Sequence, residues 1–318
     1  MVLESFRITG SAVAQIFLLG AIGYFLTKKD ILGQEGLNIL SRLTLDITLP
    51  VLIFCQLVKD FSFGRYPDWW VFPLVSVAIT IAGLIVGFIF SWFIKGSQHK
   101  AQFISLVTFQ NSGYLPLALI AALLPAEQAA PVFIYLFLFL LGFNLVMFSL
   151  GVYMLAFSKE KKFELASLFS PPVAATLISL AVIFFGLNRF IPDMVLNPLK
   201  MVGDCTLPLA MFVVGGSLAS IKLKHVDIGP VFLLALAKLV VLPLAGLFIL
   251  MKLNISELIG LLILIELAVP SATTLSVIVR HYKKEDLLIS QGIFLTHIVS
   301  LITLPLFLSL YFMRVMIK

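Results

Sequence analysis

Charge is scarce in this chain, and its scarcity excludes an ordinary soluble protein. Asp, Glu, Lys and Arg together make up 12% of the residues, whereas globular proteins carry roughly 25%. The few charged residues stand in short clusters between long apolar runs, and the mean hydropathy is +1.11. This pattern is typical of membrane spans joined by short loops.

Cysteine and the motifs of metal or nucleotide chemistry are equally sparse. The two cysteines, Cys55 and Cys205, lie in apolar segments, so no disulfide framework is expected. His99, His225 and His281 form no metal spacing, and no HExxH, P-loop or CxxC pattern occurs. The net charge of +6 has no basic stripe with interleaved aromatics. We therefore expect neither a cofactor nor a nucleic-acid partner.

Ten segments are apolar enough to cross a bilayer core of about 30 Å, which takes about 20 residues of helix. They cover residues 8–27, 37–58, 70–95, 101–124, 130–157, 171–187, 197–221, 229–251, 256–280 and 288–313, the sixth being the shortest. The connections are short, so no soluble domain is expected. The predicted fold class is an all-α polytopic membrane protein in contact with lipid.

The distribution of Lys and Arg predicts the orientation. With ten spans both termini lie on one side, and the other side carries more Lys and Arg. Because cytoplasmic loops are enriched in these residues, we expect both termini outside a bacterial or archaeal cell (inner) membrane. The N-terminal segment lacks a small-residue cleavage pattern and reads as an uncleaved first span.

A short motif recurs in the second and seventh predicted spans. Asp46-Ile47-Thr48-Leu49-Pro50 matches Asp204-Cys205-Thr206-Leu207-Pro208 at an offset of 158 residues. The same offset carries Asn111–Pro116 of the fourth span onto residues 269–274 of the ninth. Two five-span halves, residues 1–158 and 159–318, would enter the membrane from opposite sides, which predicts an inverted repeat.

The fourth and ninth predicted spans contain residues that interrupt helices. Gly frees the backbone, and Pro removes a donor and clashes with the preceding turn. Unpaired backbone groups cost several kcal/mol each in hydrocarbon, so a broken span needs a polar cavity. We predict that the two broken helices cross, with substrate-binding residues Asn111, Ser112, Gly113, Tyr114, Pro116, Pro270, Ser271, Thr273 and Thr274. Pro50 and Pro208, by contrast, read as simple kinks.

Two broken helices also suggest the kind of ligand. Each new half-helix begins with free N–H groups and about half a positive charge, so two such ends favour an anion such as a carboxylate. Gln110, Asn144 and His297 are further candidates to line the cavity, although a lone intramembrane His or Asn is more often a helix-packing residue.

Glu266 and Lys238 are predicted charges inside spans, where charge costs roughly 2.5–3.5 kcal/mol on insertion scales. Glu266 lies at the C-terminal end of a half-helix, where the dipole disfavours an ionised acid. It should be protonated, paired, or next to a bound cation such as Na⁺. Lys238 either pairs with it as a structural counter-ion or helps to hold the anion, and the sequence leaves both open.

The order of these motifs resembles the auxin efflux carrier family, in its prokaryotic branch with malonate and malate carriers. The matching residues extend over nearly the whole chain: Gly23-Tyr24 before Lys28-Lys29, Leu49–Phe54, Asn111–Leu115, Ser170-Pro171-Pro172, Pro208-Leu209-Ala210, Gly215–Leu218, Pro270, Ala272 and Tyr282. One departure is that Pro116 and Ala118 stand where the family usually has Gly and Pro, which predicts a shifted break.

The resemblance implies ten spans divided into a scaffold (spans 1, 2, 6 and 7) and a transport domain (spans 3–5 and 8–10). It also implies elevator-type alternating access and a homodimer formed through the scaffold. Similar folds occur in bile-acid sodium symporters and sodium/proton antiporters, which implies that Glu266 couples transport to Na⁺ or H⁺.

We therefore expect a secondary active or facilitative transporter of a small organic anion. One alternative is a membrane sensor that transports nothing. A second is an intramembrane aspartyl protease that uses Asp46 and Asp204. Such proteases need a Gly-x-Gly-Asp segment, and Met201-Val202-Gly203-Asp204 lacks its first Gly.

Overall fold

The computed structural model describes residues 2–156, 169–221, 228–253, 255–281 and 287–314. Regular structure in these residues is helical, apart from one isolated bridge between Gln110 and Ser271. The prediction of an all-helical protein is confirmed. Within the same ranges seven helical segments are long and apolar enough to cross a membrane, in agreement with a multi-pass membrane protein.

These seven segments coincide with seven of the ten predicted spans. They are α1 (Val2–Lys28), α2–η1–α3 (Gln34–Arg42, Leu43–Thr48, Leu49–Asp60), α4 (Val71–Ser91), α7–η2–α8 (Ala126–Val146, Met147–Gly151, Val152–Ala156), α10–α11 (Asp193–Asp204, Thr206–Ala219), α12–η5–α13 (Ile228–Leu236, Ala237–Val241, Leu242–Leu250) and α16 (Leu287–Arg314). The sixth predicted span is the short helix α9 (Pro171–Phe184), which η4 (Leu187–Phe190) follows.

The fourth and ninth predicted spans are each broken into two helices. The fourth consists of α5 (Ser97–Thr108) and α6 (Tyr114–Leu123), and the ninth of α14 (Glu257–Ala268) and α15 (Thr274–His281). The two intervening segments are extended and lie antiparallel. Asn111 N donates to Pro270 O and Ala272 N donates to Phe109 O, both at 2.9 Å. The two breaks therefore satisfy each other's backbone groups, which otherwise would be left unpaired.

The fourth span breaks earlier than its Gly and Pro suggest. Pro116 does not interrupt the helix but is the third residue of α6, where a missing N–H costs little because that N–H has no partner in the helix. The helix ends of the two broken spans also differ from the predicted alignment. Thr108 and Ala268, and again Tyr114 and Thr274, are related by an offset of 160 residues, not 158.

Three long spans widen into π-helical turns. Two of these turns, η1 and η5, end just before Pro50 and Pro243. A proline within a helix leaves the carbonyl of the preceding turn without its N–H donor and crowds it, which favours such a local widening. Asp46 and Lys238 lie in η1 and η5 respectively, and η2 follows Asn144 closely. Pro50 thus distorts its helix without breaking it.

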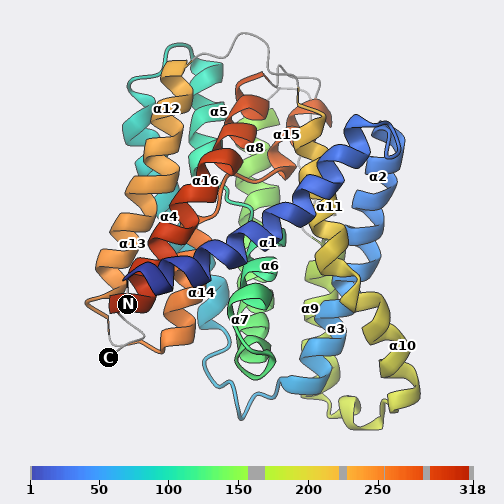
Figure 1. Ribbon diagram of the computed structural model, residues 1–318. Helices are drawn as coiled ribbons and strands as arrows, with labels where there is room; N and C mark the ends of the chain where they lie inside the picture. Colours follow the sequence, from blue (N-terminus) through green and yellow to red (C-terminus); the bar gives the residue numbers. More distant parts are fainter. Residues whose placement is uncertain (1, 157–168, 222–227, 254, 282–286, 315–318) are drawn as a thin grey trace.

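The helices pack as two groups (Figure 1). In one, α3 packs on α9 and α10, and α1 packs on α11. In the other, α4 packs on α5 and α7, while α14 packs on α13 and α16. Gly23 and Gly215 permit the close approach of α1 and α11, because a methyl group on either would overlap the backbone of the other helix. Contacts between the groups are made by α1, which also packs on α16, and by α6, which contacts α1, α7 and α11.

The two ends of the described chain lie together. Thr9 Oγ1 on α1 donates to Pro305 O on α16 at 3.1 Å. Figure 1 shows the start of α1 beside the end of α16.

Candidate functional site

A cavity of about 260 Å³ opens beside the crossing of the two broken spans. Its wall is formed by the starts of α6, α9 and α15, together with η1 and the α7–η2 segment. Its lining residues are Leu45, Asp46, Leu49, Gln110, Asn111, Ser112, Gly113, Tyr114, Leu140, Phe143, Asn144, Met147, Phe148, Ser170, Pro171, Pro172, Ala272, Thr273 and Thr274. The structure thus brings together polar residues from four predicted spans and the start of a fifth.

Most of the predicted site residues reach this cavity. Asn111, Ser112, Gly113, Tyr114, Thr273 and Thr274 line it, as do Gln110 and Asn144. Five of these, Gln110, Asn111, Ser112, Tyr114 and Thr273, are at most 9% exposed, so water reaches them poorly. Pro270 and Ser271 lie behind the wall, since Pro270 O accepts the Asn111 N–H and Ser271 Oγ donates to Leu106 O at 2.7 Å. Pro116 lies inside α6 and is not among the lining residues.

Several buried oxygens at the crossing have no hydrogen-bond partner within the described part of the chain. They include Gln110 Oε1, Ser112 Oγ, Tyr114 OH and Glu266 Oε1. An unsatisfied buried polar group costs about 1–3 kcal/mol, and such groups in a native protein often mark a missing ligand, ion or water. The residues concerned adjoin or line the cavity.

Glu266 lies behind the cavity wall and is completely buried. Gln110 Nε2 donates to Glu266 Oε2 at 3.3 Å, and Ser112 lies close to the same carboxyl without meeting hydrogen-bond geometry. Lys238 is also buried and lies on η5, which packs on α14. The two residues form no direct ion pair, because their nitrogen and oxygen atoms are more than 4.0 Å apart. The structure therefore places two buried ionisable residues on packed elements without a direct ion pair.

His297 does not line the cavity but supports a residue that does. Its Nδ1 lies 2.8 Å from Ile293 O, which can only accept, so Nδ1 carries the proton. The Nε2 atom is then the acceptor for Asn111 Nδ2 at 3.5 Å, a long contact. His297 also borders a second, apolar cavity of about 230 Å³ between α1, α6, α11 and α16.

Asp46 and Ser170 are parts of the cavity wall that the sequence did not assign to it. The sequence pointed to Asp46 only as part of the repeated motif and as a candidate protease acid. Asp204, its counterpart, is not among the lining residues and pairs with Lys200 at 2.6 Å. The two aspartates are therefore separated in role, with one at the cavity and the other in an exposed ion pair.

Comparison with known proteins identifies the family. A family model described as "Membrane transport protein" matches residues 9–166 and 154–308. The chain belongs to the auxin efflux carrier family of membrane transport proteins. This family consists of transporters, so the protease alternative is excluded.

Relatives of this transporter occur in archaea and in plants. The chain is 25% identical over 297 residues to an uncharacterized transporter of Methanocaldococcus jannaschii, covering 92% of this chain and 95% of that protein. An uncharacterized transporter of Methanothermobacter thermautotrophicus is 25% identical over 300 residues with the same coverage. PIN-LIKES 6 of Arabidopsis thaliana is 32% identical over 125 residues, which are 38% of this chain and 29% of the plant protein.

Proposed function

We propose that this transporter carries a small organic anion, a mono- or dicarboxylate, through the cavity at the helix crossing. The observation that supports it most is that α6 and α15 both begin at this cavity. Helix N-termini offer N–H donors and a partial positive charge to an anion. In α15 the N–H groups of Leu275 and Ser276 already bond to Ala272 O and Thr273 O, so α6 supplies more of the free donors.

The unpartnered side chains add to this argument. Ser112 Oγ and Tyr114 OH are buried at the start of α6 and lack partners among the described residues. Both hydroxyls can donate to a carboxylate that docks at the helix end. A substrate would then satisfy groups whose burial is otherwise unfavourable.

Transport by alternating access follows from a division of the ten segments into two bodies. The proposed scaffold is α1, α2–α3, α9 and α10–α11, and the proposed transport domain is α4–α8 with α12–α16. Packing of α3 on α9 and α10, and of α4 on α5 and α7, supports this division, while α1 and α6 contact both groups and lie at the boundary. The matched ends of the two broken spans support an inverted repeat of residues 1–158 and 159–318. Sliding of the transport domain would expose the cavity to either side of the membrane.

The oxygens behind the cavity suggest a coupling ion. Gln110 Oε1 and Glu266 Oε1 are unpartnered and lie at one buried carboxyl. Oxygen ligands of this kind suit a hard cation, and the carboxyl can alternatively take up a proton. We therefore propose Na⁺ or H⁺ coupling through Glu266.

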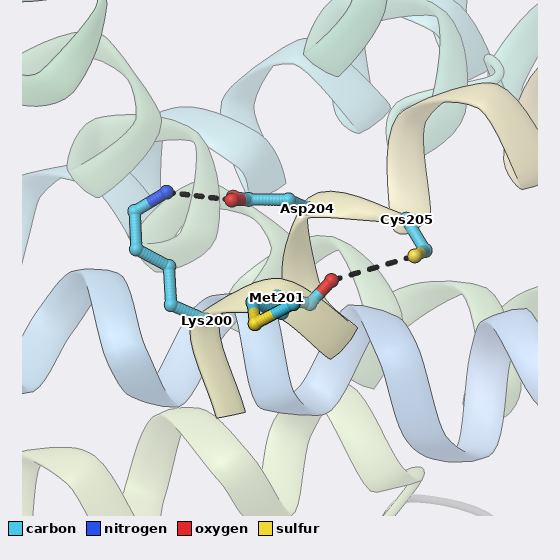
Figure 2. Close-up of polar contacts among 4 residues, drawn as sticks. All are labelled: Lys200, Met201, Asp204 and Cys205. Atoms are coloured by element: carbon cyan, nitrogen blue, oxygen red, sulfur yellow. Dashed lines mark hydrogen bonds and ion pairs between the residues drawn. The ribbon is translucent and has the colours of Figure 1, made fainter. Parts of the chain in front are cut away.

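A homodimer is proposed through the scaffold. Lys200 and Asp204 of α10 form an ion pair whose side chains are 56% and 54% exposed (Figure 2). The exposed Met201 lies beside them. An ion pair facing lipid is costly, so a second protomer is expected to cover it.

The proposed topology keeps both termini outside the cell membrane.

Uptake by purified protein in liposomes tests the main proposal. The wild type should take up or exchange a labelled carboxylate, and Asn111→Ala should abolish the uptake. The matched control is Asn188→Ala, because Asn188 lies on η4 and its amide bonds to Val58 O away from the cavity. Normal transport by Asn111→Ala would show that the cavity at the crossing is not the substrate site.

A further inference from the structure

Asp46 places a negative charge in the wall of the proposed substrate cavity. Its side chain is exposed there, on the widened turn η1. Within the described residues, no Lys, Arg or His nitrogen lies within 4.0 Å of its carboxylate. Tyr114, the first residue of α6, lines the same cavity. Asp46 therefore stands near the helix end where the substrate carboxylate is proposed to dock.

The cavity wall has little positive charge to compensate a second anionic group. None of its described lining residues is Lys, Arg or His. The N-termini of α6 and α15 each contribute about half a positive charge, enough to balance roughly one carboxylate. A second ionised carboxylate would have to lie in the same small volume as Asp46, and like charges in one site repel each other.

Asn111 adds a second acceptor to the same wall. Its Nδ2 atom is directed at His297 Nε2, and His297 is held in the accepting tautomer by Ile293 O. The amide N–H that remains and the carbonyl Oδ1 are then left for the cavity. Asn144 and Ser170 also line the cavity, and their amide and hydroxyl groups can accept as well as donate. The wall thus offers neutral acceptors beside Asp46 to a hydroxyl or amino group of the substrate.

From this arrangement we infer that Asp46 is a specificity-determining residue, which selects carboxylates that carry an amino or hydroxyl group and rejects those with a second ionised carboxylate. The inference rests on the proposed function. The carboxylate docks at the start of α6 and the donating group faces Asp46. A cavity of about 260 Å³ lies below the roughly 300–1,000 Å³ of pockets for drug-sized ligands, so the substrate is small.

Four labelled three-carbon acids separate the possibilities in a liposome uptake assay. Alanine carries an ammonium group, lactate a hydroxyl, malonate a second carboxylate, and propionate no second group. The wild type should prefer alanine or lactate to both propionate and malonate. Asp46→Asn should lower the preference for the favoured acid over malonate about tenfold, equivalent to about 1.4 kcal/mol. Asp46→Glu, which keeps the charge, should retain the wild-type order.

Asp204→Asn is the matched control, because Asp204 belongs to the same repeated motif but lies outside the cavity lining. It should leave the ratio of uptake rates unchanged. Wild-type preference for malonate or propionate, or an unchanged ratio in Asp46→Asn, would overturn the role of Asp46 while leaving carboxylate transport in place. Failure of the wild type to transport any of the four acids would overturn both proposals. Asp46 is exposed, so its variants are expected to fold, which size-exclusion chromatography checks.

Discussion

The buried charges Glu266 and Lys238 allow a quantitative prediction. Glu266→Gln removes one charge and leaves Lys238 uncompensated, while Lys238→Met does the reverse. The charged atoms are more than 4.0 Å apart, so their attraction is below about 4 kcal/mol at an effective dielectric constant of about 20. Breaking a buried pair on one side only is strongly destabilising, because an unpaired charge remains.

A double-mutant cycle measures this coupling. We expect each single variant to unfold at a temperature several degrees below the wild type, and the double variant to recover part of the loss. The interaction free energy should be about 1–3 kcal/mol, within the range for residues that share a network. Glu257→Gln is the matched control, since it makes the same change at an exposed position of the same helix α14, and it should lower the unfolding temperature much less, by no more than the loss of one carboxylate at a helix N-terminus.

The same variants test whether substrate transport is coupled to a gradient of Na⁺ or H⁺. A tenfold inward gradient of Na⁺ or H⁺ stores about 1.4 kcal/mol and sustains at most tenfold accumulation in an electroneutral one-to-one cycle. Glu266→Gln should lose accumulation and retain equilibration of the substrate. Additive effects of the two substitutions would refute the interaction between the charges, and wild-type transport that ignores both gradients would refute coupling.

Three further substitutions test the packing and the cavity wall. Gly215→Val should push α1 away from α11 and destabilise the protein by about 1–3 kcal/mol, whereas Gly10→Ala should not, because the space around Gly10 is open. Equal unfolding temperatures of the two variants would contradict the close approach of α1 and α11. Tyr114→Phe should lower substrate affinity roughly tenfold in a binding assay without lowering the unfolding temperature, because the hydroxyl has no described partner; unchanged affinity would remove that hydroxyl from the site. His297→Leu should raise the KM for transport several-fold, and His297→Gln should restore the wild-type KM, because Gln can accept a hydrogen bond from Asn111. Equal KM values in both variants would argue that His297 does not position Asn111.

Hydropathy alone predicted the helical segments, since apolar runs of span length leave few alternatives. Gly113 and Pro270 correctly marked the two spans that break. The start of the first break, at Phe109, was not predictable from local sequence, because the bridge between Gln110 and Ser271 fixes it. The prediction that Pro116 lies at the break was wrong because a proline near the start of a helix is tolerated, and Pro116 lies inside α6.

The site was predictable only in part. The residues flanking the breaks were found because backbone interruptions and polar side chains coincide there. Asp46 reaches the cavity through packing of η1 near α9, and Ser170 through its place at the start of α9. Neither contact has a local signal. The roles of His297 and Lys238 likewise depend on which residues of distant spans face them.

Protection of a single engineered cysteine tests the central claim most directly. In a variant with Cys55→Ser and Cys205→Ser, Thr274→Cys places a thiol at a partly exposed position of the cavity wall, and Ser62→Cys places one on an exposed loop as a control. A transported carboxylate should slow maleimide labelling at position 274 in a concentration-dependent manner and leave position 62 unaffected. Labelling at position 274 that is insensitive to a transported carboxylate would place the substrate elsewhere.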